Sequence, residues 1–115
     1  MARILAVDDD DLHLRLYQRL LGDEHEVEVA SRAEEGLRKA QVEPGFDAIL
    51  VDFEMPEMNG EGLFQRLCSL DGSAADRVLF VTGDPTHVAH LGRPVLRKPF
   101  EPGTLLRLLA AVLDI

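Results

Sequence analysis

The sequence predicts an α/β fold in which a doubly wound, five-stranded parallel sheet is covered by helices on both faces. Short apolar runs alternate along the 115-residue chain with segments whose apolar residues recur every three or four positions. This is the pattern of repeated strand–helix units. Two of the runs, 48–51 and 78–81, are apolar throughout, which is typical of strands covered on both faces.

The first strand and helix follow from a change of period. Residues 4–7 form an apolar run that acidic residues end abruptly, which indicates a buried strand. After Asp10, leucines at 12, 16 and 20 predict one apolar helix face, and Gly22 marks the end of the helix. Leu14 lies off this face and is interpreted as partner surface, as core or as incidentally exposed. Asp10 itself and Asp11 are interpreted as a cap and a first-turn acid.

The next elements are marked by alternation, a capping pattern and a turn. Residues 26–29 alternate polar and apolar side chains, as in a half-exposed edge strand. Ser31 and Glu34 match a capping box that would begin the second helix. Pro44-Gly45 predicts a turn before a third strand over 46–51.

The C-terminal half continues the alternation of strands and helices. Asn59-Gly60 predicts the start of the third helix after a loop, and Pro102 predicts the first turn of the last one. Residues 78–81 are a buried fourth strand, and 95–98 a short, edge-like fifth strand. Residues 86–91 can form only a turn or two before the next Gly and Pro. We therefore expect the fourth helix to be shortened or absent.

Length, charge and cysteine content restrict the class of protein. The chain has the length of a single domain, predicted over residues 1–115. Its 12 basic and 21 acidic residues give a net charge of −9, which argues against nucleic acid and membranes as direct partners. One cysteine, Cys68, excludes an internal disulfide. No apolar run approaches the ~18 residues of a membrane span, and the N-terminus lacks a signal-peptide pattern, so we expect a cytoplasmic protein.

Residues capable of chemistry follow directly after four of the predicted strands. The carboxyl ends of parallel strands meet at one edge of a sheet, which is where open α/β folds bind ligands. In chain order, these residues are Asp8, Asp9, Asp52, Glu54, Thr82 and Lys98. The sequence therefore predicts that carboxylates, a hydroxyl and an ammonium group converge at this edge.

Three converging carboxylates predict a cation. At ~5 Å they would repel by roughly 3 kcal/mol per pair at an effective dielectric near 20, which is heavy for a domain with a stability of ~5–15 kcal/mol. Oxygen ligands without a nearby His or Cys favour Mg²⁺ over zinc. A lysine and a hydroxyl beside such a site suit the oxygens of a phosphoryl group, and an aspartate can itself be the nucleophile.

Five short motifs occur in register, four of them at the ends of predicted strands and one in the loop that follows the third strand. They are Val7-Asp8-Asp9, Val51-Asp52, Met55-Pro56 with Asn59-Gly60, Val81-Thr82-Gly83 and Lys98-Pro99-Phe100. Together they resemble the response-regulator receiver domain, the phosphoacceptor module of two-component signalling typified by the chemotaxis regulator CheY. The resemblance covers essentially the whole chain, and we predict the strand order 2-1-3-4-5.

The resemblance implies a metal site and a phosphoacceptor. Asp52 matches the phosphoacceptor aspartate. Asp8 and Asp9 match the acidic pair that holds Mg²⁺. Glu54 occupies the position whose backbone carbonyl completes the metal site.

The resemblance also implies the reaction and the partner. Thr82 and Lys98 match the residues that contact the phosphoryl oxygens, and the family's cis Lys-Pro bond implies that Lys98-Pro99 is cis. A histidine kinase or a histidine phosphotransfer domain would transfer its phosphoryl group to Asp52, and water would later remove it. Such a domain catalyses only its own modification, signals by a conformational shift, and is expected to be a monomer or a weak dimer.

Two departures from the family pattern affect the signal output. The family usually couples the strand-four hydroxyl to an aromatic residue three positions before the lysine, where this chain has Val95. The segment from Thr82 to Lys98 is also shorter than usual, and such trimmed receivers resemble those of hybrid histidine kinases. Glu54 and Asp84 lie at positions where the family tunes reaction rates, in a direction that the sequence leaves open.

Two other classes of protein use some of the same residue types. A small hydrolase of the haloacid-dehalogenase type also uses an aspartate after a strand, but it would not need Asp8 and Asp9. A degenerate receiver that only binds partners is disfavoured by the complete set of site residues. His87 and His90 could chelate a metal on a helix, but the interpretation as solvated polar residues is favoured, and His13 is assigned no role.

Overall fold

The protein is built around one parallel sheet. The structure is a computed structural model and describes residues 1–42 and 44–114. The five strands lie in the order β2-β1-β3-β4-β5, so the predicted order is confirmed. The strands are β1 Arg3–Val7, β2 Glu26–Ala30, β3 Ala48–Asp52, β4 Val78–Thr82 and β5 Val95–Arg97. The α-helices are α1 Asp11–Leu21, α2 Ala33–Ala40, α3 Gly60–Leu70 and α4 Pro102–Leu113.

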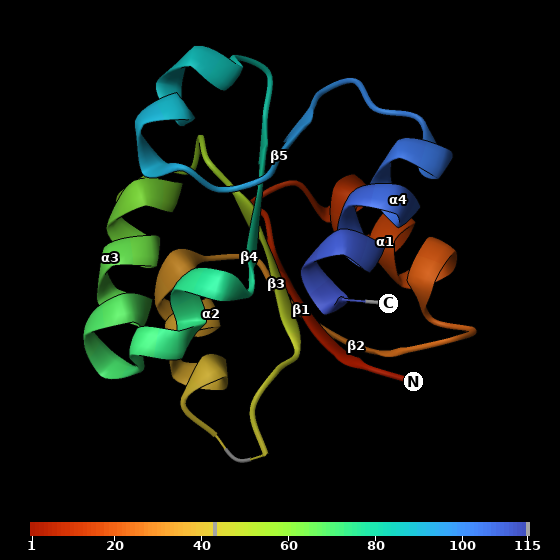
Figure 1. Ribbon diagram of the computed structural model, residues 1–115, viewed down its shortest axis with the longest axis horizontal. Helices are drawn as coiled ribbons and strands as arrows, with labels where there is room; N and C mark the ends of the chain where they lie inside the picture. Colours follow the sequence, from red (N-terminus) through yellow and green to blue (C-terminus); the bar gives the residue numbers. More distant parts are fainter. Residues whose placement is uncertain (43, 115) are drawn as a thin grey trace.

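Helices cover both faces of the sheet, as predicted. Helices α2 and α3 lie on one face, and α1 and α4 lie on the other (Figure 1). Phe53, Leu63 and Phe80 belong to the apolar core on the α2–α3 side, whereas Tyr17 and Leu105 belong to the core on the α1–α4 side. The central strands β3 and β4 are buried along their whole length, while β2 is half-exposed at the edge. The apolar and alternating patterns therefore predicted the strand positions correctly.

The apolar face of α1 differs from the prediction. The buried side chains are Leu14, Tyr17 and Leu21, whereas Leu12 is 70% exposed. Residues spaced by four drift by ~40° per step around a helix, whereas alternating steps of three and four stay on one face. The interpretation of Leu12 as the start of the buried face was thus wrong, and Leu14 is core rather than partner surface.

The predicted start of the second helix is wrong, whereas that of the third is confirmed. Asn59 caps α3 by accepting a hydrogen bond from the backbone N–H of Gly62 at 3.0 Å, as expected. Before α2, however, the backbone N–H of Ser31 donates to the carboxylate of Glu35 at 2.9 Å, and Arg32 occupies the cap position without a side-chain bond. The helix begins at Ala33, later than the capping box implied. The acid that accepts the hydrogen bond from Ser31 is therefore Glu35 instead of Glu34.

Between β4 and β5, where a helix was expected to be shortened or absent, the chain forms only two short 3₁₀ turns. This prediction is confirmed. The turns span Pro85–His87 and Ala89–Leu91. Val88, between them, is completely buried against the core on the α2–α3 side. Gly92 then takes a left-handed conformation with φ of 67°, which glycine adopts without strain.

The start of α3 approaches the segment after β3 closely. The backbone N–H of Gly60 donates to the carbonyl of Phe53 at 2.9 Å, and a Cβ on Gly60 would lie 2.8 Å from the Phe53 Cα. Gly60→Ala should therefore lower the free energy of unfolding by about 1–3 kcal/mol, measured in urea. Gly103→Ala, in the first turn of α4 with nothing within 4 Å of its Cβ position, should instead stabilise the chain by about 0.5–1 kcal/mol. Equal effects of the two substitutions would contradict the close-approach explanation.

Candidate functional site

Three carboxylates meet at the C-terminal edge of the sheet. Oxygens of Asp8, Asp9 and Asp52 all lie within 4.8 Å of one another. Asp8 and Asp9 follow β1 and Asp52 ends β3, and these two strands are neighbours in the sheet. Asp8 is 1% exposed and Asp52 is 3% exposed, whereas Asp9 lies at the surface. The cluster is therefore buried on one side and open to solvent on the other.

Lys98 brings a positive charge to this cluster from the end of β5. Its ammonium Nζ donates a hydrogen bond to Asp52 Oδ1 at 3.1 Å and lies 3.8 Å from Asp8 Oδ2. Its backbone N–H donates to the carbonyl of Thr82 at 2.8 Å, which ties the residue to the end of β4. The Lys98-Pro99 peptide bond is cis, as predicted. One ammonium group thus contacts two of the three carboxylates.

Burial and neighbouring charge alter the protonation of Asp52. The pKa of Asp52 is raised from 3.8 to about 7, first by burial of the carboxyl and then by the negative charge of Asp8, while the hydrogen bond and charge of Lys98 act in the opposite direction. Near neutral pH the bare site therefore holds a proton on Asp52 part of the time. A bound cation would favour the ionised carboxylate.

Asp8 is held in place by the start of α1. The backbone N–H of Asp10 donates to Asp8 Oδ1 at 2.9 Å, and His13 Nδ1 lies 3.0 Å from Asp8 Oδ2. Asp10 in turn caps α1 through the backbone N–H of Leu12, which confirms its interpretation as a cap. A contact of His13 with this site was not expected from the sequence. The feature that could have indicated this contact is the position of His13 in the first turn of α1, which begins soon after the end of β1.

Glu54 and Thr82 form a second polar group beside the cluster. The hydroxyl of Thr82 donates to Glu54 Oε2 at 2.5 Å, and the backbone N–H of Gly83 donates to Glu54 Oε1 at 3.4 Å. The side chain of Glu54 therefore contacts the end of β4. The expected role of Glu54 in the metal site concerned its backbone carbonyl and stays a prediction.

The two histidines between β4 and β5 pair with different acids. His87 Nε2 lies 3.2 Å from Asp84 Oδ2, whereas His90 Nε2 lies 3.0 Å from Glu61 Oε1 on α3. The segment that carries them forms two 3₁₀ turns instead of one helix. This arrangement supports the interpretation of these histidines as exposed polar residues.

The donor set at the sheet edge fits Mg²⁺. It consists of three aspartates whose oxygens lie close enough to share an ion. Hard carboxylate oxygens are the ligands that Mg²⁺ prefers in proteins, usually together with several waters. The open side of the cluster at Asp9 leaves room for those waters. The raised pKa of Asp52 is the effect that an added positive charge would reverse.

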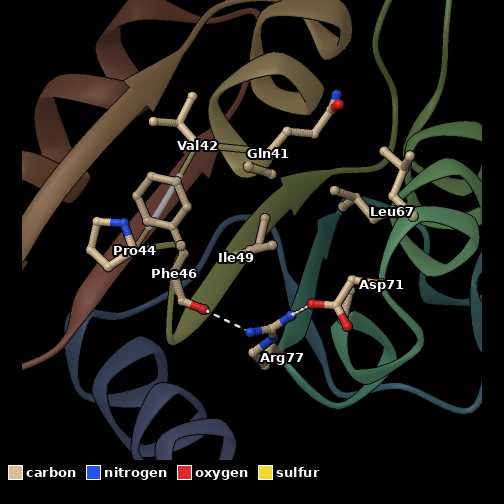
Figure 2. Close-up of a pocket in the computed structure, with 12 residues that line it drawn as sticks. Gln41, Val42, Pro44, Phe46, Ile49, Leu67, Asp71 and Arg77 are labelled. Carbon is tan, nitrogen blue, oxygen red and sulfur yellow. Dashed lines mark hydrogen bonds and ion pairs between the residues drawn. The ribbon is translucent and has the colours of Figure 1, made fainter.

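A separate cavity of about 560 Å³ lies at the opposite, N-terminal edge of the sheet (Figure 2). Apolar side chains such as Phe46, Ile49 and Leu67 line it. Arg77 donates to the carbonyl of Phe46 at 3.3 Å and to Asp71 Oδ2 at 2.5 Å. These bonds give Arg77 a structural role, connecting the start of β3 with the end of α3.

A doubly wound parallel sheet that gathers an acidic cluster, a lysine and a hydroxyl at its C-terminal edge defines the class of receiver domains. The family model of the response regulator receiver domain matches residues 4–110. The chain therefore belongs to this family, and it is a receiver domain of two-component signal transduction. Receiver domains interact with histidine kinases or phosphotransfer proteins, and they are signalling modules.

Similar proteins agree with this assignment. Protein PilH of Pseudomonas aeruginosa is 32% identical over 120 residues, which cover 98% of this chain and 98% of PilH. The structure of the chemotaxis response regulator CheY4 of Vibrio cholerae is 33% identical, with a TM-score of 0.86 over 97% of this chain and 98% of that chain. The receiver domain of the hybrid histidine kinase CckA is 30% identical, with a TM-score of 0.80 over 96% of this chain and 98% of that domain.

Two longer curated relatives match only in part, since the chain spans 20% and 16% of their lengths. Among the described residues, the structure has no helix long and apolar enough to cross a membrane. The cytoplasmic location stays a prediction.

Proposed function

We propose that Asp52 accepts a phosphoryl group from a phosphohistidine of a histidine kinase or a phosphotransfer domain. The observation that carries the proposal is the 3.1 Å contact between Lys98 Nζ and Asp52 Oδ1 inside a cluster of three carboxylates. A buried aspartate at the end of a strand, with an ammonium group directly beside it, is suited to bind a dianionic group and to form an acyl phosphate. Asp8 and Asp9, with Asp52 and the backbone carbonyl of Glu54, would hold Mg²⁺.

The transfer exchanges one bond to phosphorus for another. An oxygen of the Asp52 carboxylate attacks the phosphorus in line with the P–N bond of phosphohistidine. That bond breaks, and the imidazole leaves with its electron pair and takes a proton from water. Lys98 and the Thr82 hydroxyl contact the phosphoryl oxygens. When bound, Mg²⁺ supplies positive charge that offsets the charge of the transferring group.

Loss of the phosphoryl group uses the same residues. Water attacks the phosphorus of the acyl phosphate, the carboxylate of Asp52 is restored, and inorganic phosphate is released. The domain thus catalyses only its own modification and does not turn over a diffusing metabolite. We further propose that residues 1–115 form one such domain, which acts in the cytoplasm as a monomer or a weak dimer. The similarity to the CckA receiver supports a hybrid histidine kinase as one context.

Acetyl phosphate with Mg²⁺, read by intact mass, tests the proposal. The native chain should gain one phosphoryl group, and Asp52→Ala should gain none, because its nucleophile is gone. EDTA should prevent the addition. Asp76→Ala, which removes an exposed acid outside the site, should behave as the native chain. Phosphorylation of the Asp52→Ala variant, or continuous release of phosphate from p-nitrophenyl phosphate over many cycles, would contradict the proposal.

A further inference from the structure

We propose that Glu54 restrains phosphorylation of Asp52 by holding the Thr82 hydroxyl in its resting position. Glu54 is in this view a positioning residue, which acts through Thr82 and sets the rate of the reaction. The inference rests on the proposed function, because it concerns the hydroxyl that would contact the phosphoryl group. It predicts that Glu54 slows phosphorylation, whereas the sequence left the direction of its effect on the rate open.

In the resting state the single proton of the Thr82 hydroxyl is already donated to another group. A threonine hydroxyl has one proton to donate, and Thr82 donates it to Glu54 Oε2 at 2.5 Å. On its acceptor side, the Thr82 oxygen receives the backbone N–H of Asp84 at 3.1 Å. The hydroxyl therefore has no second proton for a phosphoryl oxygen on Asp52. Before it can donate there, its bond to Glu54 must break.

The bond to Glu54 is of a strong type. Hydrogen bonds to an ionised carboxylate are roughly twice as strong as those between neutral groups. Glu54 also receives the backbone N–H of Gly83 at 3.4 Å, so its carboxylate spans two consecutive residues at the end of β4. Thr82 is completely buried, whereas Glu54 is exposed. The carboxylate can therefore move into solvent when Thr82 leaves it, which makes the restraint reversible.

The backbone on both sides of Glu54 fixes where its side chain lies. Phe53, on one side, is buried, and its backbone N–H donates to the carbonyl of Val81 at 2.9 Å. Its carbonyl receives the backbone N–H of Gly60 at 2.9 Å. Met55, on the other side, is also buried in the core on the α2–α3 side. Glu54 thus stands between two anchored residues, directly opposite the end of β4.

The negative charge of Glu54 acts in the same direction as the hydrogen bond. A carboxylate beside the cluster repels an incoming phosphodonor, so its removal would also speed phosphorylation by a purely electrostatic effect. An experiment on Glu54 alone does not separate the two effects. The electrostatic effect persists without the Thr82 hydroxyl, whereas the hydrogen-bond effect requires that hydroxyl.

Four variants separate the two effects: Glu54→Ala, Glu54→Gln, Thr82→Ala and the double variant. The measurement is the initial rate of phosphorylation by acetyl phosphate with Mg²⁺. Glu54→Ala should raise the rate about tenfold. Glu54→Gln should raise it by a smaller factor, about threefold, because its amide oxygen is still a neutral acceptor for Thr82. In the Thr82→Ala background, Glu54→Ala should change the rate by less than about twofold.

Two results would overturn the inference. An equal gain from Glu54→Ala with and without Thr82, together with equal rates for the Gln and Ala variants, would show that Glu54 acts through its charge alone. No gain, or a slower reaction, would show that Glu54 does not restrain Thr82.

A second measurement distinguishes these failures from failure of the proposed function. Urea unfolding of the native chain, Glu54→Ala, Thr82→Ala and the double variant of these two substitutions, in EDTA and without any phosphodonor, should show non-additive shifts of the midpoint if Glu54 and Thr82 are bonded in the resting state. Coupling without phosphorylation of the native chain would mean that the proposed function is wrong. Phosphorylation without coupling would mean that only the inference about Glu54 is wrong.

Discussion

Asp52→Asn is expected to raise the free energy of unfolding at pH 8, in EDTA, by about 2–4 kcal/mol. The folded chain raises the pKa of Asp52 from 3.8 to about 7, chiefly by burying the carboxyl and then by placing it beside Asp8. Ionising Asp52 at pH 8 therefore costs more in the folded state than in the unfolded one. Asparagine removes that cost, because it has a similar shape and no charge.

The pH dependence follows from the direction of the pKa shift. As the pH rises, the unfolded chain releases the Asp52 proton near pH 3.8, whereas the folded chain holds it until about pH 7. Between these values the folded state binds more protons, so the stability contributed by Asp52 falls with rising pH. The advantage of Asp52→Asn should accordingly be larger at pH 8 than at pH 5, measured by urea unfolding.

Mg²⁺ and a surface control complete this experiment. Added Mg²⁺ should stabilise the native chain more than the asparagine variant, because a ligand that binds only the folded state stabilises it by mass action. Asp76→Asn, which alters an exposed acid, should change stability by less than about 0.5 kcal/mol. A variant less stable than the native chain at pH 8 in EDTA would contradict the argument that the ionised cluster is destabilising.

Lys98→Ala is expected to lower the rate of phosphorylation by acetyl phosphate about 100-fold, the usual cost of removing one donor aimed at developing charge. The ammonium contacts Asp52 at 3.1 Å and lies 3.8 Å from Asp8. Its loss would remove the group that contacts the phosphoryl oxygens in the proposed reaction. The measurement is the initial rate by intact mass, at a Mg²⁺ concentration that saturates the native chain.

Arg97→Ala is the matched control for Lys98→Ala. It removes the same charge from the preceding residue of the chain, but Arg97 lies in β5 and is exposed. The charge of an exposed side chain is screened by salt, so its loss should leave the rate within about twofold. Equal losses from the two substitutions would mean that net charge, rather than the contact with Asp52, determines the rate.

The periodicity of the sequence was sufficient for the architecture and for the place of the site. Fully apolar runs identified β3 and β4, and alternation identified the exposed edge strand β2. Because the carboxyl ends of parallel strands share one edge of the sheet, the positions of Asp52 and Lys98 after their strands were enough to predict that the two side chains lie close together. Their contact at 3.1 Å agrees with that expectation. The strand pattern was informative because burial on both faces restricts nearly every side chain in those strands.

Details that depend on rotation and side-chain reach needed the tertiary structure. The buried face of α1 includes Leu14 and excludes Leu12, and these two residues lie about 160° apart around the helix axis. Neither the bond between His13 and Asp8 nor the bond between Glu54 and Thr82 follows from spacing. The first depends on how α1 sits above β1, and the second depends on how two loops meet.

The residues at the strand ends could be identified from the apolar pattern alone, because the run of apolar side chains in a buried strand stops where the strand leaves the core. The hydrogen-bond partners of those residues in the resting state, in contrast, follow from the three-dimensional packing. A threonine hydroxyl or a carboxylate can bond to any of several partners within a few ångströms. Which of them it contacts depends on the packing of segments that are far apart in the chain. Thr82 and Glu54, 28 positions apart, are the clearest example.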